Sequence, residues 1–461
     1  MRRLSPYRKE IPATLALAIP IVVTQLAHIS MSFVDTVMVG RLGAEALAGV
    51  ALGNTVFFNI MIFCMGILMA VGPMVSQAFG ADDADPIGRS VRQGLWLAGI
   101  LGVVSSFIIW HADVLLGWLG QSPENIGRAI SYLRAIMWGI FPFLGFVALR
   151  SFMEAVSRPR TVTVIALVGV VLNVGLNMVL MYGHLGFPAM GLVGTGWAST
   201  GVFWINFLVL LGVVAREKGF ASYRIFSRLG RPDPSYFKEL FRIGWPIGAS
   251  MGVETSLFMA TVMMMGWIST TALAAHQVAI QCAAFTFMVP LGIGMASSVR
   301  VGQAVGRRDR DGMVRAGLTG MVLSTVFMSG AALVFWIIPR PVVGLYLDLS
   351  APANFDVVTV AVSLLAVAAV FQVVDGIQVS AMGALRGLKD TRMPMIISVI
   401  SYWGIGLTSG YVLAFPMGYG EQGLWVGLVL GLASAAILLT FRFFRHARVA
   451  PEPIAGIRDT F

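Results

Sequence analysis

The stretch FDVVTVAVSLLAVAAVFQVVDGIQVSAMGA, residues 355–384, decides the fold class of this chain. It is long enough to cross a bilayer as a helix, for which about 20 apolar residues suffice. Away from its ends the only ionisable residue is Asp375. A carboxylate at that depth costs roughly 2.5–3.5 kcal/mol on insertion scales, so such an acid usually faces a polar interior and marks an ion or substrate path.

The composition extends this interpretation to the whole chain. The 461 residues are 57% hydrophobic and only 12% charged, which indicates a polytopic membrane protein rather than a soluble one. The net charge of +10 does not indicate nucleic-acid binding, because the basic residues fall in short loops between apolar runs. Cys64 and Cys282 both lie in apolar segments and form no disulfide or metal-binding pattern.

Apolar runs of sufficient length predict about twelve membrane-spanning helices, and hence an all-α fold. Short polar turns separate most of them. The predicted helices are residues 12–38, 50–77, 90–111, 127–149, 161–183, 189–214, 237–265, 274–299, 313–338, 355–384, 393–415 and 421–443.

The distribution of basic residues predicts the orientation of these helices. All but four of the 32 Lys and Arg residues fall on one side of the predicted membrane, and the four exceptions are Arg41, Arg128, Arg134 and Arg340. Because cytoplasmic loops carry the excess of basic residues, both termini are expected in the cytoplasm. An even number of helices agrees with this, and we expect a multi-pass protein of the cell inner membrane.

An internal repeat is visible at an offset of 226 residues. Its landmarks are Ala-Leu-Ala at 46–48 and 272–274, Gln-Ala-x-Gly at 77–80 and 303–306, and the pair Pro20 and Pro246. Each half therefore holds about six helices, and an even number means that both halves enter the membrane in the same direction. Parallel repeats of this kind are typical of secondary transporters, which bind their substrate in a cleft between the halves.

The predicted domains follow from the repeat. Residues 1–214 form an N-terminal six-helix bundle, and residues 237–461 form a C-terminal six-helix bundle with a short cytoplasmic tail. Between them, residues 215–236 form a basic cytoplasmic linker. We expect two pseudo-symmetric bundles around a central cleft. A monomer is expected, because the two halves already build the cleft.

Polar residues in the first half suggest a cation site. Asp35 lies late in its helix, and either a proton or cation ligand or an interfacial cap would explain it. Asn173 and Asn177 are four residues apart and share one helix face, so they could be interhelical hydrogen-bonding groups or neutral oxygen ligands. Gly191 and Thr195 would add a backbone carbonyl and a hydroxyl. Together these groups could bind Na⁺, although spacing alone does not show that they converge.

The second half has acids at other positions. Glu254 lies within a predicted helix, and Asp375 has Gln372 three residues before it, close enough to orient its carboxylate. A structural hydrogen-bond network would explain them. Proton exchange explains them better, because burial moves the pKa of an acid toward the physiological range. The repeat does not duplicate the acids, since Asp35 corresponds to Thr261 and Glu254 corresponds to His28.

One proline lies early in the first helix of each half. Pro20 and Pro246 each remove a backbone hydrogen bond and favour a kink. They are either static bends or moving hinges.

No enzymatic machinery is visible in the sequence. None of the four lysines follows a glycine, so no phosphate-binding Gly-Lys-Ser/Thr loop is present, and the histidines form no zinc motif. No catalytic residues are predicted and no cofactor is expected. A membrane-embedded hydrolase has no support beyond dispersed acids. Transport energy is therefore expected from an ion gradient.

Several motifs resemble the multidrug and toxic compound extrusion (MATE) family, NorM-type branch. The resemblance runs from about Pro12 to Arg442. It rests on Val-Asp-Thr-Val-Met-Val-Gly at 34–40, Ala-Leu-Ala at 46–48, Gln-Ala-Phe-Gly at 77–80, Val-Asp-Gly-Ile-Gln at 374–378, and Gly-Ala-Leu-Arg-Gly-Leu-Lys-Asp-Thr at 383–391.

The resemblance implies an architecture of two six-helix bundles and the efflux of bulky, often cationic organic compounds in exchange for Na⁺ or H⁺. The family's sites map onto this chain as an N-half cation site at Asp35, Asn173, Asn177 and Thr195, with Gly191 as a backbone ligand, and a C-half site at Glu254 and Asp375. One position departs from the pattern. Where the family often has Tyr, one turn before the second acid, this chain has Phe371, which keeps a cation–π surface but loses a hydroxyl ligand.

The sequence thus predicts a secondary multidrug antiporter that works by alternating access. Its expected partners are organic cations and the lipid bilayer. The alternative is a flippase or exporter of a lipid-linked or amphiphilic precursor, whose cleft would need cationic groups for an anionic head. The predicted mid-membrane charges are mostly acidic, which favours cationic cargo.

Overall fold

The computed structural model describes residues 5–118, 120–227 and 229–449, and every regular element within them is helical. Twelve helical spans in this part of the chain are long and apolar enough to cross a membrane, which confirms the predicted all-α, multi-pass fold. The spans are Tyr7–Gly40, Ala44–Gly80, Ala84–Trp110, Pro123–Ala155, Pro159–Leu180, Leu192–Arg216, Pro234–Ile268, Thr270–Gly306, Arg310–Ile337, Pro352–Gly387, Arg392–Ala414 and Gly420–Ala447.

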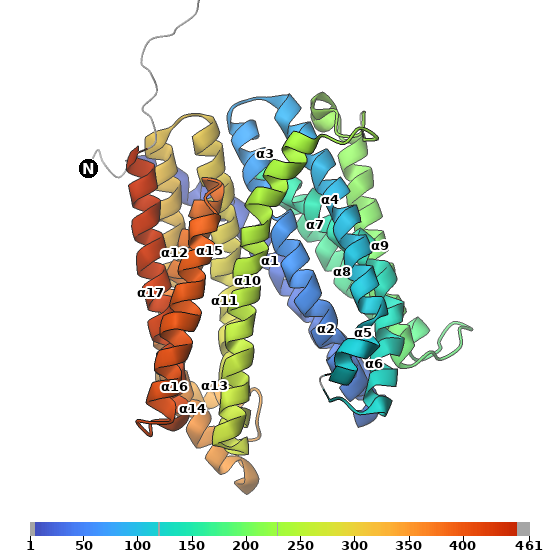
Figure 1. The fold of residues 1–461 in the computed structure, drawn as a ribbon, viewed down its shortest axis with the longest axis vertical. Helices are drawn as coiled ribbons and strands as arrows, with labels where there is room; N and C mark the ends of the chain where they lie inside the picture. Colours follow the sequence, from blue (N-terminus) through green and yellow to red (C-terminus); the bar gives the residue numbers. More distant parts are fainter. Residues whose placement is uncertain (1–4, 119, 228, 450–461) are drawn as a thin grey trace, which may run out of the picture. The chain divides into compact units, whose positions relative to one another are not determined.

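Several spans consist of more than one helical element (Figure 1). Pro73 and Pro142 lie near two of these junctions. Each lacks the N–H that would donate to the preceding helical turn, so the helix is interrupted there. The elements are α1 (Ser5–Gly40), α2 (Ala44–Leu68), α3 (Val71–Gly80), α4 (Ala84–Trp110), α5 (Ala112–Trp118), α6 (Pro123–Ile136), α7 (Ile140–Ala155), α8 (Pro159–Leu180), α9 (Leu192–Arg216), α10 (Pro234–Ile268), α11 (Thr270–Gly306), α12 (Arg310–Ile337), α13 (Pro339–Val343), α14 (Phe355–Gly387), α15 (Arg392–Val399), η5 (Ile400–Leu407), α16 (Thr408–Ala414) and α17 (Gly420–Val449).

The internal repeat extends to the backbone of the turns. In the turn before α4 the residue Asp82 has a φ of +57°, and its counterpart Arg308, before α12, also has a φ of +57°. The next residue in each turn, Asp83 or Asp309, caps the following helix by accepting a backbone hydrogen bond through its side chain. Both turns therefore reverse the chain sharply and lead into a capped helix, and both use the same two backbone conformations.

Contacts group the chain into two compact units. The N-terminal unit consists of Val23–Phe79 and Asp83–Ala249, and the C-terminal unit consists of the residues up to Val22, Gly80–Asp82 and those from Ser250 onward. Helices α1 and α10 thus each pass from one unit to the other, shortly after Pro20 and Pro246 respectively. The bundle boundaries at 214 and 237 remain a prediction.

Helix α14 forms the core of the C-terminal unit, where it packs against α11, α12 and α17. It approaches α11 closely at Gly383, where a Cβ atom would lie only 2.2 Å from the carbonyl oxygen of Gly294. Small residues that allow helices to approach in this way are typical of membrane interfaces. This packing fixes the position of Asp375, two turns before Gly383.

Helix α7 has the corresponding place in the N-terminal unit, between α4 and α9. Every residue from 144 to 155 is buried, including Arg150 and Glu154. The Nε atom of Arg150 donates to Glu154 at 2.7 Å, and its Nη2 atom donates to Gln25 of α1 at 2.8 Å. The buried arginine is therefore paired, as burial of a charge requires.

Candidate functional site

Asp35 lies at the centre of a polar cluster in the N-terminal unit. The Nδ2 atom of Asn177 donates to Asp35 Oδ1 at 2.6 Å and to Asn173 Oδ1 at 3.3 Å. Both asparagines are fully buried, whereas Asp35 is half-buried. The structure therefore brings together the three residues that the sequence placed on two separate helices.

Ser199 of α9 completes this cluster and was not predicted. Its hydroxyl donates to Asp35 Oδ2 at 3.3 Å, so each carboxylate oxygen accepts one hydrogen bond. Ser199 lies four residues after Thr195, on the same face of α9. That spacing was the signal that could have identified it.

Thr195 and Gly191 both form hydrogen bonds outside this cluster. The Thr195 hydroxyl donates to the sulfur of Met181 at 3.0 Å, and the Gly191 N–H donates to the Met181 carbonyl at 3.1 Å. These bonds fasten the start of α9 to the end of α8. A direct role for either residue in a cation site remains a prediction.

Two further hydrogen bonds hold α1 against α8 on either side of Asp35. The Thr24 hydroxyl donates to the Thr163 hydroxyl at 3.1 Å, and the Tyr182 hydroxyl donates to the carbonyl of Met38 at 2.8 Å. The Asp35 contact thus lies between two other polar connections along these helices. Loss of the Asp35 contact would leave the helices connected at Thr24 and Met38.

The cluster has an oxygen available for a ligand. Asn177 Oδ1 is buried and has no hydrogen-bond partner among the described residues. A carboxylate, amide oxygens and a hydroxyl are the hard oxygen ligands that a monovalent cation accepts. The same carboxylate could instead take up a proton.

The C-terminal unit contains the second pair of acids. Asp375 on α14 is only 4% exposed, and its Oδ1 atom has no hydrogen-bond partner in the described part of the chain. Glu254, on α10, is half-buried and lies within electrostatic range of Asp375. Two acids that interact in an apolar surrounding favour the uptake of a cation or proton.

Phe371 and Gln372 are buried beside this pair. Gln372 Oε1 accepts from the Thr286 hydroxyl of α11 at 2.9 Å, so its carbonyl oxygen supports helix packing. Phe371 is 2% exposed and makes edge-to-face contacts with Phe258 and with Trp425, at ring-centre distances of 6.2 and 5.5 Å. In this conformation its neighbours, rather than an open cleft, cover the ring.

Two residues of the C-terminal unit extend the predicted site. Arg386 was predicted in a loop, but α14 continues to Gly387 and includes it, eleven residues and about 16 Å along the helix from Asp375. Tyr402 is fully buried in the π-helix η5, a conformation that is frequent at functional sites. Its hydroxyl has no hydrogen-bond partner among the described residues and lies within electrostatic range of Glu254, Asp375 and Arg386.

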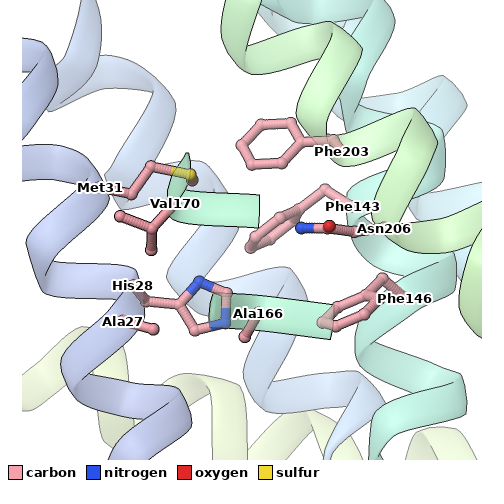
Figure 2. A pocket seen from close by; sticks show the side chains of 9 residues that line it. All are labelled: Ala27, His28, Met31, Phe143, Phe146, Ala166, Val170, Phe203 and Asn206. Atoms are coloured by element: carbon pink, nitrogen blue, oxygen red, sulfur yellow. The ribbon is translucent and has the colours of Figure 1, made fainter. Parts of the chain in front are cut away.

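The N-terminal unit has a small cavity at the position related to Glu254 by the repeat. Figure 2 shows the His28 ring of α1 and the Asn206 amide of α9 among aromatic side chains that include Phe143 and Phe146 of α7. Its volume is about 10 Å³, which is the size needed for a single water molecule. The repeat thus places an acid in one unit and an imidazole in the other.

Comparison with known proteins gives consistent matches over nearly the whole chain. The family model MatE matches residues 20–179 and again residues 246–412, so its two matches begin at Pro20 and Pro246. A protein of Mesorhizobium japonicum named "Probable multidrug resistance protein NorM" is 43% identical over 451 residues, covering 97% of this chain and 96% of that protein. A protein of Rhizobium meliloti with the same name is 41% identical over 445 residues, covering 96% and 95%.

The fold also matches solved structures. One of them, described as "Outward-facing conformation of a multidrug resistance MATE family transporter of the MOP superfamily", has a TM-score of 0.87 at 19% sequence identity. The similarity covers 95% of this chain and 96% of that chain. At this level of identity the likeness concerns the fold alone.

Proposed function

This chain belongs to the MatE family and is a multidrug efflux transporter rather than an enzyme, and from that premise we propose that it works as an antiporter. It would export organic compounds, often cationic, in exchange for Na⁺ or H⁺ moving inward. Its location would be the cell inner membrane. No cofactor is required by this scheme, because the ion gradient supplies the energy.

The Asp35 cluster is the observation that supports coupling to an ion. Its carboxylate accepts hydrogen bonds from Asn177 and Ser199 at the junction of α1, α8 and α9. A cation would coordinate the same oxygens together with Asn177 Oδ1. A proton would convert one acceptor oxygen into a donor, so that at least one of these hydrogen bonds must rearrange.

We propose that this rearrangement is transmitted along α1. After Pro20, α1 packs with the N-terminal unit, and before it α1 packs with the C-terminal unit. Ion binding at Asp35 would change how the later part of α1 docks on α8, and the proline is the point at which the helix can bend. Alternating access would follow from this change, with Pro246 as the equivalent point in α10.

The second pair of acids supports cationic cargo. Glu254 and Asp375 form an acidic pair, of which only Glu254 interacts with the cation Arg386. An organic cation would be attracted to it, and its displacement by Na⁺ or H⁺ would release the cargo.

Arg386 also favours the second candidate function, transport of a lipid-linked or amphiphilic anion. It is a half-buried cation in α14, and its guanidinium contacts the sulfur of Met382 at 3.1 Å. A guanidinium in such a position could bind a phosphate head. The acidic pair of Glu254 and Asp375 in the same unit makes this the weaker candidate.

The test uses proteoliposomes that hold the purified chain and a fluorescent organic cation, without ATP. A Na⁺ gradient and a pH gradient are imposed separately, and movement of the dye against its own gradient is recorded. Movement driven by either gradient would support antiport and identify the ion. Movement driven by neither, together with transfer of a labelled anionic lipid between leaflets, would favour the second candidate.

A further inference from the structure

A groove lies in the N-terminal unit, and its described lining residues do not include those of the Asp35 cluster. It has a volume of about 440 Å³ and lies between α4, α7, α9 and the segment that follows α9. Its lining is apolar and aromatic, and it includes Gly99, Phe141, Phe207 and Leu229. We propose that it binds one phospholipid of the bilayer, with an acyl chain in the groove and an anionic headgroup at its basic end.

The length of the groove matches one leaflet. Along α9 it extends from Ala215 to Trp204, which is eleven residues and therefore about 16 Å. Half of the hydrocarbon core of a bilayer is about 15 Å. The groove therefore offers an acyl chain a continuous apolar surface from the headgroup level to the middle of the membrane.

The groove offers a ligand no free indole N–H. The Trp204 Nε1 atom, at the deep end, already donates to the carbonyl of Trp138 at 3.2 Å. The Trp96 Nε1 atom, near the other end, donates to the carbonyl of Leu229 at 2.8 Å. A drug-like molecule with polar groups would leave those groups unsatisfied here, whereas a hydrocarbon chain has none to satisfy.

Basic residues at the mouth of the groove, the end near Ala215 and Leu229, favour an anionic headgroup. Ala215 is followed by Arg216, and Leu229 is followed two residues later by Arg231, and both arginines are exposed. Basic residues at the membrane surface attract anionic lipids. An organic cation, the cargo proposed above, would instead be repelled at this end, and none of the described lining residues is acidic.

The mouth is held in place before any lipid arrives. The Nη1 atom of Arg92 donates to the carbonyl of Arg224 at 2.8 Å, and the Nη2 atom of Arg89 lies 2.5 Å from the Asp233 carboxylate. Together with Trp96, these side chains lie along one face of α4 and fasten the segment after α9 to it. A preformed site loses less conformational entropy when it binds.

The test measures retained lipid rather than transport, so it is independent of the proposed antiport. The protein is purified in detergent with phosphatidylglycerol or phosphatidylcholine, and bound lipid is counted by native mass spectrometry. Gly99→Leu fills the groove, since a Cβ there meets no atom within 4 Å. Gly175→Leu is the matched control, because it also meets no atom within 4 Å and lies on α8, outside the groove lining.

We expect the wild type and Gly175→Leu to retain phosphatidylglycerol in preference to phosphatidylcholine, and Gly99→Leu to lose it. Arg216→Gln and Arg231→Gln should each weaken retention about fivefold, which corresponds to about 1 kcal/mol per basic residue. Equal retention by Gly99→Leu and Gly175→Leu would overturn the acyl-chain site. Retention that ignores both headgroup and arginines would overturn the choice of an anionic lipid, and displacement of the lipid by a fluorescent organic cation would assign the groove to cargo.

Discussion

Asn177 donates a 2.6 Å hydrogen bond to Asp35, although the two residues are 142 positions apart in the chain. The bond joins α8 to α1, the helix that passes from one compact unit to the other. The proposed binding of an ion at this carboxylate would therefore act on a helix that belongs to both units. The first predictions test this relationship.

Asp35→Asn should abolish ion-driven transport while leaving the protein folded. An amide keeps the size of the side chain but can neither take up a proton nor neutralise Na⁺ at neutral pH. We expect the initial rate of gradient-driven dye transport to fall at least about tenfold, in line with loss of more than about 1.4 kcal/mol of coupling. Asp113→Asn, at an exposed acid of α5, is the control and should transport normally. Wild-type coupling in Asp35→Asn would refute the proposed role.

Ser199→Ala should change the affinity for the coupling ion rather than prevent transport. The hydroxyl supplies one hydrogen bond to Asp35, and such bonds contribute about 1 kcal/mol, so the ion concentration for half-maximal transport should change about fivefold. Ser131→Ala removes a serine that bonds only its own helix and should leave this concentration unchanged. If both variants behave alike, Ser199 is not part of the site.

Tyr402→Phe should alter ion or cargo affinity without unfolding the C-terminal unit. The substitution removes a buried hydroxyl that has no hydrogen-bond partner among the described residues, so little packing is lost. We expect the concentration of coupling ion or of dye for half-maximal transport to change about threefold to tenfold. Tyr411→Phe, at a half-exposed tyrosine on α16, serves as the control. Unchanged affinities would exclude Tyr402 from the site.

Arg150→Leu should destabilise the N-terminal unit, because it leaves the carboxylate of Glu154 buried without its cation. Breaking one side of a buried ion pair costs about 3–5 kcal/mol. The midpoint of thermal unfolding in detergent should fall clearly, and Arg150→Leu combined with Glu154→Leu should restore most of it. A double variant as unstable as the single one would show that packing of the arginine stem, rather than its charge, matters.

Asp233 should hold the segment after α9 at every physiological pH. Its hydrogen bonds from Ser235 and from Arg89 lower its pKa to about 2. Because the folded pKa lies below the ordinary value near 4, this contribution is complete above about pH 4 and is lost only as the pH falls through about 2. Tryptic cleavage after Lys218 and Arg224 should therefore be slow and independent of this group between about pH 6 and 8.5.

Asp233→Asn removes the charge and should accelerate that cleavage at neutral pH. Asp85→Asn is the matched control, since Asp85 also contacts Arg89 but at 3.4 Å and with an exposed side chain. Equal cleavage of both variants would mean that the ion pair does not hold the segment.

The helices and the repeat could be predicted from the sequence because both depend on local composition. Runs such as 355–384 are apolar enough to be stable only as buried helices, and the offset between Pro20 and Pro246 recurs in the turns at Asp82 and Arg308. Sequence spacing also showed that Asn173 and Asn177 share a face, because the helix period alone determines this.

The contacts of the site could not be predicted in the same way. Ser199 reaches Asp35, while Thr195, one turn earlier, bonds to Met181, and only the crossing of α9 over α8 decides between them. Likewise, Arg386 belonged to a loop by composition, but α14 extends past it.

The sequence by itself therefore determined that this chain is a twelve-span membrane protein with two related halves and isolated intramembrane acids. The bilayer explains this, because each segment that crosses it must satisfy its own backbone hydrogen bonds within an apolar helix. Only the tertiary structure decided that Asp35 meets Asn177 and Ser199, that Tyr402 lies within range of Glu254 and Asp375, and that a groove of one-leaflet length lies along α9. These depend on how helices far apart in the chain pack together, which no local pattern specifies.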